Sequence, residues 1–143
     1  MKLTKFSAAA IPVLLLTACA GTKQMVDIPD QSKPIANRAK SRIYVVRDSM
    51  LGGMVGTKVY DSKQYIGMTY PHGCLSWERK PGKTKLISKA ENTSTYSFTA
   101  SKGETYYFKQ AISIGIMGPR AKLVKVNPTE GKKLISQCKF SKK

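Results

Sequence analysis

Side chains that could perform acid–base, nucleophilic or metal chemistry are few in this sequence. His72 is its one histidine, lies between Pro71 and Gly73 in an expected loop, and has no carboxylate placed in the sequence as its partner. His72 and Cys74 could supply two ligands to zinc, but a zinc site takes three or four protein ligands and the sequence offers no convincing third. Because catalysis needs an acid, a base or a nucleophile brought together, we expect no catalytic residues and no metal.

The glycine-rich stretch at residues 52–56 is another candidate for chemistry, since glycine-rich loops can bind phosphate groups. It precedes an expected strand and lacks the Lys-Ser/Thr pair of a phosphate-binding loop. The acidic residues beyond residue 41 stand singly: Asp61 and Glu91 lie next to turns, and Glu130 fits a helix start. We therefore expect no cofactor.

Residues 1–18 have the three-part build of a secretory signal peptide. Lys2 and Lys5 are positively charged, residues 8–16 are apolar apart from one proline, and small residues follow. The apolar run is shorter than the roughly 20 residues that a membrane-spanning helix needs. The segment Leu16-Thr17-Ala18-Cys19 resembles the lipobox of bacterial lipoproteins. In that family the cysteine receives a diacylglyceryl group, the peptide is cut before it, and the new amino end is acylated. An ordinary signal peptide with a chance cysteine is the alternative to a lipid on Cys19.

The chain is strongly basic, with 25 Lys and Arg against 8 Asp and Glu. Removing Lys2 and Lys5 with the signal peptide leaves a formal charge of +15. Such an excess indicates anionic partners. An exported protein does not meet nucleic acid, so the expected anions are phospholipid headgroups, lipopolysaccharide phosphates and cell-wall carboxylates. A charged surface that only maintains solubility is the alternative.

Cys74 and Cys138 are the two cysteines that remain if Cys19 carries lipid. Exported proteins fold in an oxidising compartment, where a remaining pair of cysteines favours a disulfide. We predict a bridge between them. Each could instead be a small buried thiol, because free cysteine packs like a hydrophobic residue.

The rest of the chain divides into a tether and one domain. Residues 19–41 are polar, contain Pro29 and Pro34, and lack apolar periodicity, which is typical of a tether. Residues 42–143 are expected to form a small antiparallel β-sandwich with one short C-terminal helix near residues 128–137. Asn127-Pro128-Thr129-Glu130 gives the helix an N-cap, a proline in its first turn and an acidic residue at the third position.

The sandwich is predicted from short apolar segments separated by turn signals about every ten residues. Residues 95–100 alternate polar and apolar side chains, and residues 106–116 keep apolar side chains at one parity, with only Gln110 out of place. Pro81-Gly82 fits a type II turn, and Trp77 is expected to be buried. The strands are expected at residues 42–47, 57–60, 65–69, 74–79, 83–89, 95–100, 106–116 and 120–126. Residues 106–116 form either one long strand or two strands joined by a bend.

Four segments in order carry a resemblance to a known family: residues 42–47, the hairpin at 59–67, Pro81-Gly82-Lys83 and residues 103–108. This part of the chain resembles the bacterial lipoprotein family called domain of unknown function 2846, and it is similar to the PEGA-type surface domains. The hairpin turn has Ser62-Lys63 where these families tend to carry Asp-Gly. The resemblance covers residues 42–126 and implies a β-sandwich on a lipid anchor, with no known catalytic residues.

Two apolar, glycine-rich segments that contain methionine, residues 49–56 and 114–119, are unusual for loops. Methionine-rich surfaces can adapt to partners, so these segments are a candidate partner surface. Bent strand ends buried in the core are the alternative. The candidate surface residues are Met50, Leu51, Met54, Ile116 and Met117.

Three functions compete on these observations. The first is a non-catalytic envelope module that binds an anionic component or a protein there, and the second is a structural scaffold subunit of an envelope assembly. The third is a hydrolase or transferase whose site the sequence does not reveal. In Gram-negative lipoproteins an Asp after the lipidated cysteine retains the protein at the inner membrane. Ala20 takes that position here, which favours the outer membrane, facing the periplasm, if the host has one.

Overall fold

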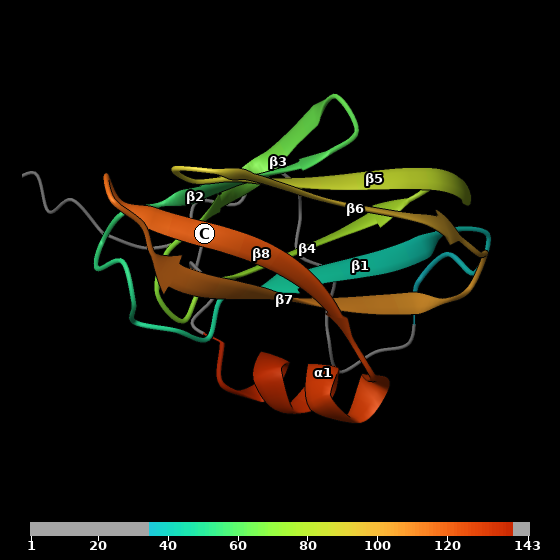
Figure 1. The fold of residues 1–143 in the computed structure, drawn as a ribbon. Coiled ribbons are helices and arrows are strands. Elements are labelled where there is room, and N and C mark those ends of the chain that lie inside the picture. Colours follow the sequence, from blue (N-terminus) through green and yellow to red (C-terminus); the bar gives the residue numbers. More distant parts are fainter. Residues whose placement is uncertain (1–34, 139–143) are drawn as a thin grey trace, which may run out of the picture.

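Two four-stranded sheets face each other in the computed structural model, which describes residues 35–138 (Figure 1). The first sheet has the order β4-β1-β7-β8 and the second has the order β3-β2-β5-β6. The elements are β1 (Ser41–Val46), β2 (Thr57–Asp61), β3 (Gln64–Thr69), β4 (Cys74–Arg79), β5 (Gly82–Lys89), β6 (Thr93–Ala100), β7 (Thr105–Ile114), β8 (Pro119–Val126) and the helix α1 (Pro128–Ser136). The predicted β-sandwich with one C-terminal helix is confirmed.

One strand pair departs from the expected antiparallel arrangement. β1 runs parallel to β7, with Ile43 opposite Tyr106 and Val45 opposite Phe108, whereas the other neighbouring strands are antiparallel. A parallel pair needs a long crossover connection. Here the chain supplies it by building β4 and the whole second sheet between β1 and β7.

β1 is buried on both of its faces. Ile43 and Val45 point into the core between the sheets, where they pack with Trp77 and Phe108. The alternate residues Tyr44 and Val46 are also buried, on the outer face of the sheet. Two-sided burial explains why this strand is a continuous apolar run and shows no alternation.

The alternation in β6 is confirmed, and the parity of β7 is confirmed in part. Tyr96 and Phe98 pack against the core, while the residues between them face solvent. In β7, Phe108 and Gln110 are fully buried. The expected inward row fails beyond Ile112: β7 ends at Ile114, which is 76% exposed, because the chain leaves the sheet at Gly115.

Gln110 stays in the inward row because the facing sheet satisfies its side chain. Its amide nitrogen donates to Ser88 Oγ at 2.7 Å, and its amide oxygen accepts a hydrogen bond from Thr69 Oγ1. Buried polar groups are tolerated when they are hydrogen-bonded. These contacts tie the two sheets together through the core.

α1 begins as the sequence predicts. Asn127 is the N-cap, and its Oδ1 accepts from the backbone NH of Glu130 at 2.9 Å. The helix lies on the outer face of the sheet that contains β1 and β7 (Figure 1). Gly131 permits this approach, because a Cβ there would overlap the ring of Tyr107.

Cys74 at the start of β4 and Cys138 after α1 form the predicted disulfide, with their Cα atoms 5.8 Å apart. Val46, Cys74 and Leu134 make a second small apolar cluster beneath the helix. The bridge therefore fastens the C-terminal helix to the sheet.

Candidate functional site

The loop between β1 and β2, residues 48–56, is built around a buried arginine. Arg47 has no exposed surface. Its two terminal nitrogens each donate a 2.7 Å hydrogen bond to a loop carbonyl, Nη1 to Val55 and Nη2 to Leu51, and Nη2 also reaches the carbonyl of Gly53 at 3.4 Å. Charged donors make strong hydrogen bonds, so the loop backbone is fixed without a helix or strand.

Burial lowers the pKa of the Arg47 guanidinium from its ordinary value, because it removes hydration from the charged form. An arginine pKa starts so high that the group keeps its proton. In the sequence, Arg47 is only the last residue of an expected strand. Its position, between an apolar strand and a glycine-rich loop, is the one sequence signal of its role in the loop.

Glu91 fixes the backbone of the loop between β7 and β8, as Arg47 does for the first loop. Its Oε2 accepts from the backbone NH of Met117 at 3.3 Å and of Gly118 at 3.0 Å, and its Oε1 lies 3.5 Å from Arg120 Nη1. Gly115 leaves room for this carboxylate, because a Cβ there would overlap it. Glu91 thus positions a loop that is distant in the sequence, whereas the sequence predicted only that it lies next to a turn.

The two loops meet at one end of the sandwich. Gly52, with a positive φ of 80°, approaches Pro119 so closely that a Cβ on the glycine would lie 2.6 Å from the proline Cβ. The exposed apolar side chains of these loops form a surface that we call the apolar tip. Its members are Met50, Leu51, Met54, Val55, Ile114, Ile116 and Met117.

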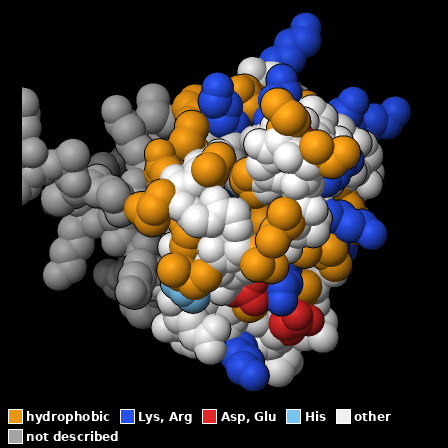
Figure 2. Space-filling view, turned by 60° about the vertical axis from the view of Figure 1, so that its left-hand side comes forward, with side chains coloured by type: hydrophobic (Ala, Val, Ile, Leu, Met, Phe, Trp, Pro, Cys, Tyr) orange, Lys and Arg blue, Asp and Glu red, His pale blue; other side chains and the backbone are white. Residues whose placement is uncertain are grey.

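All five residues of the candidate partner surface belong to the apolar tip, which rules out the alternative that they are buried strand ends. Ile116 is 97% exposed, Met117 87% and Met50 63%. Figure 2 shows hydrophobic side chains spread over this end, with lysine and arginine side chains around them. Val55 and Ile114 were not named as candidates, although both lie inside the two segments that the sequence singled out.

Positive charge lies beside the apolar tip and along the solvent faces of two strands. A hollow between the loops is lined by Val55 and Met117 together with Lys58 and Lys89. Asp48, in the first loop, is paired with Lys109 at 2.9 Å. Among residues 35–138, no carboxylate forms an ion pair with Lys58 or Lys89. Exposed positions of β5 and β8 are basic as well: Lys83, Lys85, Lys89, Arg120, Lys122 and Lys125.

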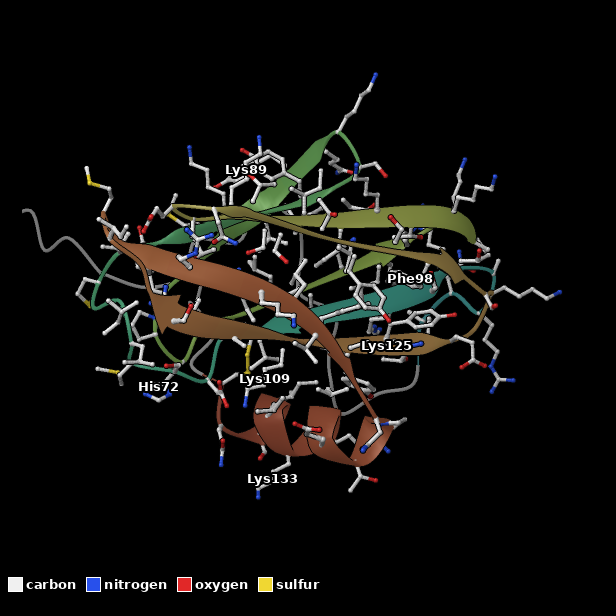
Figure 3. All side chains as sticks on the ribbon, viewed as in Figure 1. His72, Lys89, Phe98, Lys109, Lys125 and Lys133 are labelled. Carbon is white, nitrogen blue, oxygen red and sulfur yellow. A yellow bond between two sulfur atoms is a disulfide. The ribbon has the colours of Figure 1, made fainter. Side chains whose placement is uncertain are left out.

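The structure does not bring the candidate catalytic or metal-binding residues together. His72 occupies a turn between β3 and β4 with a positive φ of 59° (Figure 3), and the sulfur of Cys74 is committed to the disulfide. Trp77 is buried as predicted and donates to Asp61 Oδ2 at 3.0 Å, while Arg79 donates to Asp61 Oδ1 at 2.7 Å. Within the described part of the chain, no group of three or more His, Cys, Asp or Glu side chains could hold a metal.

The expected signal peptide, the expected lipidation site Cys19 and most of the expected tether lie outside the described residues. The end of the tether is visible: the carbonyl of Lys40 accepts from the backbone NH of Gly103 at 2.8 Å, just before β1. Of the residues that the structure describes, no helix is long and apolar enough to cross a membrane.

A Haemophilus influenzae protein described only as uncharacterized is similar to this chain. The two are 29% identical over 133 residues, which cover 90% of this chain and 79% of the other protein. No family model matches the chain, and no solved structure matches it. The similarity carries no functional description.

Proposed function

We propose that this protein is a lipid-anchored lipoprotein of the cell envelope whose sandwich is a non-catalytic binding module for an anionic envelope component. The observation that carries the proposal is the number of basic residues at exposed positions of β5 and of β8, in a chain with few acidic residues to balance them. The signal segment and the lipobox at residues 16–19 support export and the anchor. The resemblance to the domain of unknown function 2846 lipoproteins supports the same assignment.

The proposed location is the outer membrane on its periplasmic side, because Ala20 stands where inner-membrane lipoproteins carry Asp. Separation of the two membranes on a density gradient decides between them. A scaffold subunit of an envelope assembly is a second candidate, favoured by the exposed side chains of the apolar tip. Co-purification of a stoichiometric protein partner in detergent would favour the scaffold.

Salt-dependent binding tests the role of the basic surface. We expect the unlipidated chain, residues 20–143, to bind phosphatidylglycerol vesicles or cell-wall sacculi at low ionic strength and to release as salt rises. Salt shortens the Debye length and so weakens the attraction between opposite charges. Neutral phosphatidylcholine vesicles should bind far more weakly. Binding that is absent at low salt, or indifferent to salt, would make the positive charge a solvated surface only.

A charge-removal variant sharpens this test. Each lysine near an anionic surface contributes about 1 kcal/mol, or about fivefold in affinity. Replacing Lys58 and Lys89 by Gln is therefore expected to weaken binding by roughly 25-fold at low salt. The same two positions changed to Arg are the matched control, which keeps the charge and should keep the binding.

A further inference from the structure

We infer that the apolar tip inserts into the surface of a phospholipid bilayer while Lys58 and Lys89 contact its anionic headgroups. This inference deepens the proposed function, on which it rests: it assigns the bilayer as the anionic component and the apolar tip as the surface in contact. Four features of the structure lead to it.

The first feature is the shape of the tip. Ile114, Ile116 and Met117 project from a loop end, and 76–97% of each residue's surface is exposed. Side chains that project this far need a deep complementary pocket in a protein partner. A bilayer needs no such pocket, because its acyl chains rearrange around whatever apolar group enters. Apolar side chains beside basic ones are the composition of segments that lie in the membrane interface.

The second feature is that both loops are already ordered. Arg47 fixes the backbone of the first loop through the carbonyls of Leu51 and Val55. Glu91 fixes the second through the amides of Met117 and Gly118. A surface held in its binding conformation loses little conformational entropy on contact.

The third feature is the charge beside the tip. The acidic groups of the two loop regions are already neutralised, Asp48 by Lys109 and Glu91 by Arg120. Lys58 and Lys89 line the hollow between the loops with no carboxylate partner among the described residues. Insertion of the tip would bring these two ammonium groups to the level of the lipid phosphates.

The fourth feature is where the chain enters the sandwich. The tether reaches β1 at Lys40, and β1 then runs to Val46, directly before Arg47 and the first loop, so the entry point and the tip are at opposite ends (Figure 1). Cys19 and Ser41 are 41 − 19 = 22 positions apart, which is up to about 75 Å of extended chain. The longest strand, β7, has ten residues and spans about 33 Å. The tether is therefore long enough for the tip to reach the bilayer that holds the anchor.

Vesicle flotation of the unlipidated chain, residues 20–143, tests the inference. The vesicles contain phosphatidylglycerol and phosphatidylethanolamine. We expect Ile116→Ser with Met117→Ser to lower the apparent affinity by about tenfold or more, because the variant loses apolar area that the bilayer would bury. Val124→Ser with Tyr65→Ser is the matched control, since both side chains are exposed hydrophobics outside the tip. It should bind within about twofold of the unchanged protein, and cooperative melting of all three chains above the assay temperature would show that they are folded.

A second readout reports insertion itself. Ile116→Trp should shift its fluorescence to the blue on these vesicles and be quenched by brominated acyl chains, whereas Val124→Trp should do neither. The native Trp77 is buried and gives a constant background.

The possible outcomes separate the inference from the proposed function. Vesicle binding that the tip serines leave unchanged, or an Ile116→Trp chain that brominated lipids do not quench, overturns insertion. Sacculus binding without vesicle binding also overturns it, but leaves the proposed function standing. Failure to bind either surface overturns both. Loss of a co-purifying protein in the tip variant, without vesicle binding by the unchanged chain, would make the tip a protein-docking surface instead.

Discussion

Replacing Cys74 and Cys138 together by Ser is expected to lower the free energy of unfolding by about 4 kcal/mol in the chain-entropy model. The bridge joins residues 64 positions apart, so its loss frees a long loop in the unfolded chain. The native state also loses the link between β4 and the chain that follows α1. Urea unfolding of the two proteins measures the difference.

Two controls accompany this measurement. Reductant should destabilise the unchanged protein by a similar amount and leave the double serine variant as it was. Alkylation of the unfolded, unreduced protein should label neither Cys74 nor Cys138. Labelling of both, or identical urea midpoints with and without reductant, would show that the bridge does not form.

Replacing Arg47 by Met is expected to cost about 3 kcal/mol of stability, because several loop carbonyls lose a charged donor. The carbonyls of Leu51 and Val55 each receive a 2.7 Å hydrogen bond from this side chain. The loop at residues 48–56 should then exchange its amide hydrogens faster and become a site of proteolysis. Urea unfolding gives the energy, and hydrogen exchange locates the change.

The exposed Arg38 provides the matched control. Arg38→Met should change stability by no more than about 0.5 kcal/mol, as is usual for a surface substitution. Arg47→Lys keeps a charge but loses the planar fork that serves two carbonyls at once, so it should fall between the other two variants. Equal stability of Arg47→Met and Arg38→Met would contradict the role given to Arg47.

Local patterns in the sequence predict most of the strands and the helix, because their causes are local. Alternation in β6 follows from one buried face, and the Asn127 cap and the proline after it define the start of α1. The chain bends at Pro81 between β4 and β5, where a turn was expected, and Gly82 has a positive φ. These signals lie within a few residues of the structures they specify.

Features that depend on distant contacts are not visible in local patterns. The parallel pairing of β1 with β7 joins segments more than sixty residues apart, and nothing near either strand specifies it. Gln110 interrupts an apolar row in the sequence, yet Ser88 and Thr69 of the facing sheet make its burial favourable. The exposure of the apolar tip also depends on distant contacts. The side chains of Arg47 and Glu91 hold the two loops at the surface, whereas the composition of these loops also fits bent strand ends buried in the core.

Intact-mass analysis of the protein extracted from native membranes tests the proposed lipid anchor most directly. We predict a chain that begins at Cys19 and carries three acyl chains, or two in some bacteria, because Leu16-Thr17-Ala18-Cys19 resembles a lipobox. The same chain with Cys19 changed to Ser should carry no added acyl mass. A soluble mature protein that begins at another residue and has no added lipid mass would contradict the lipid anchor.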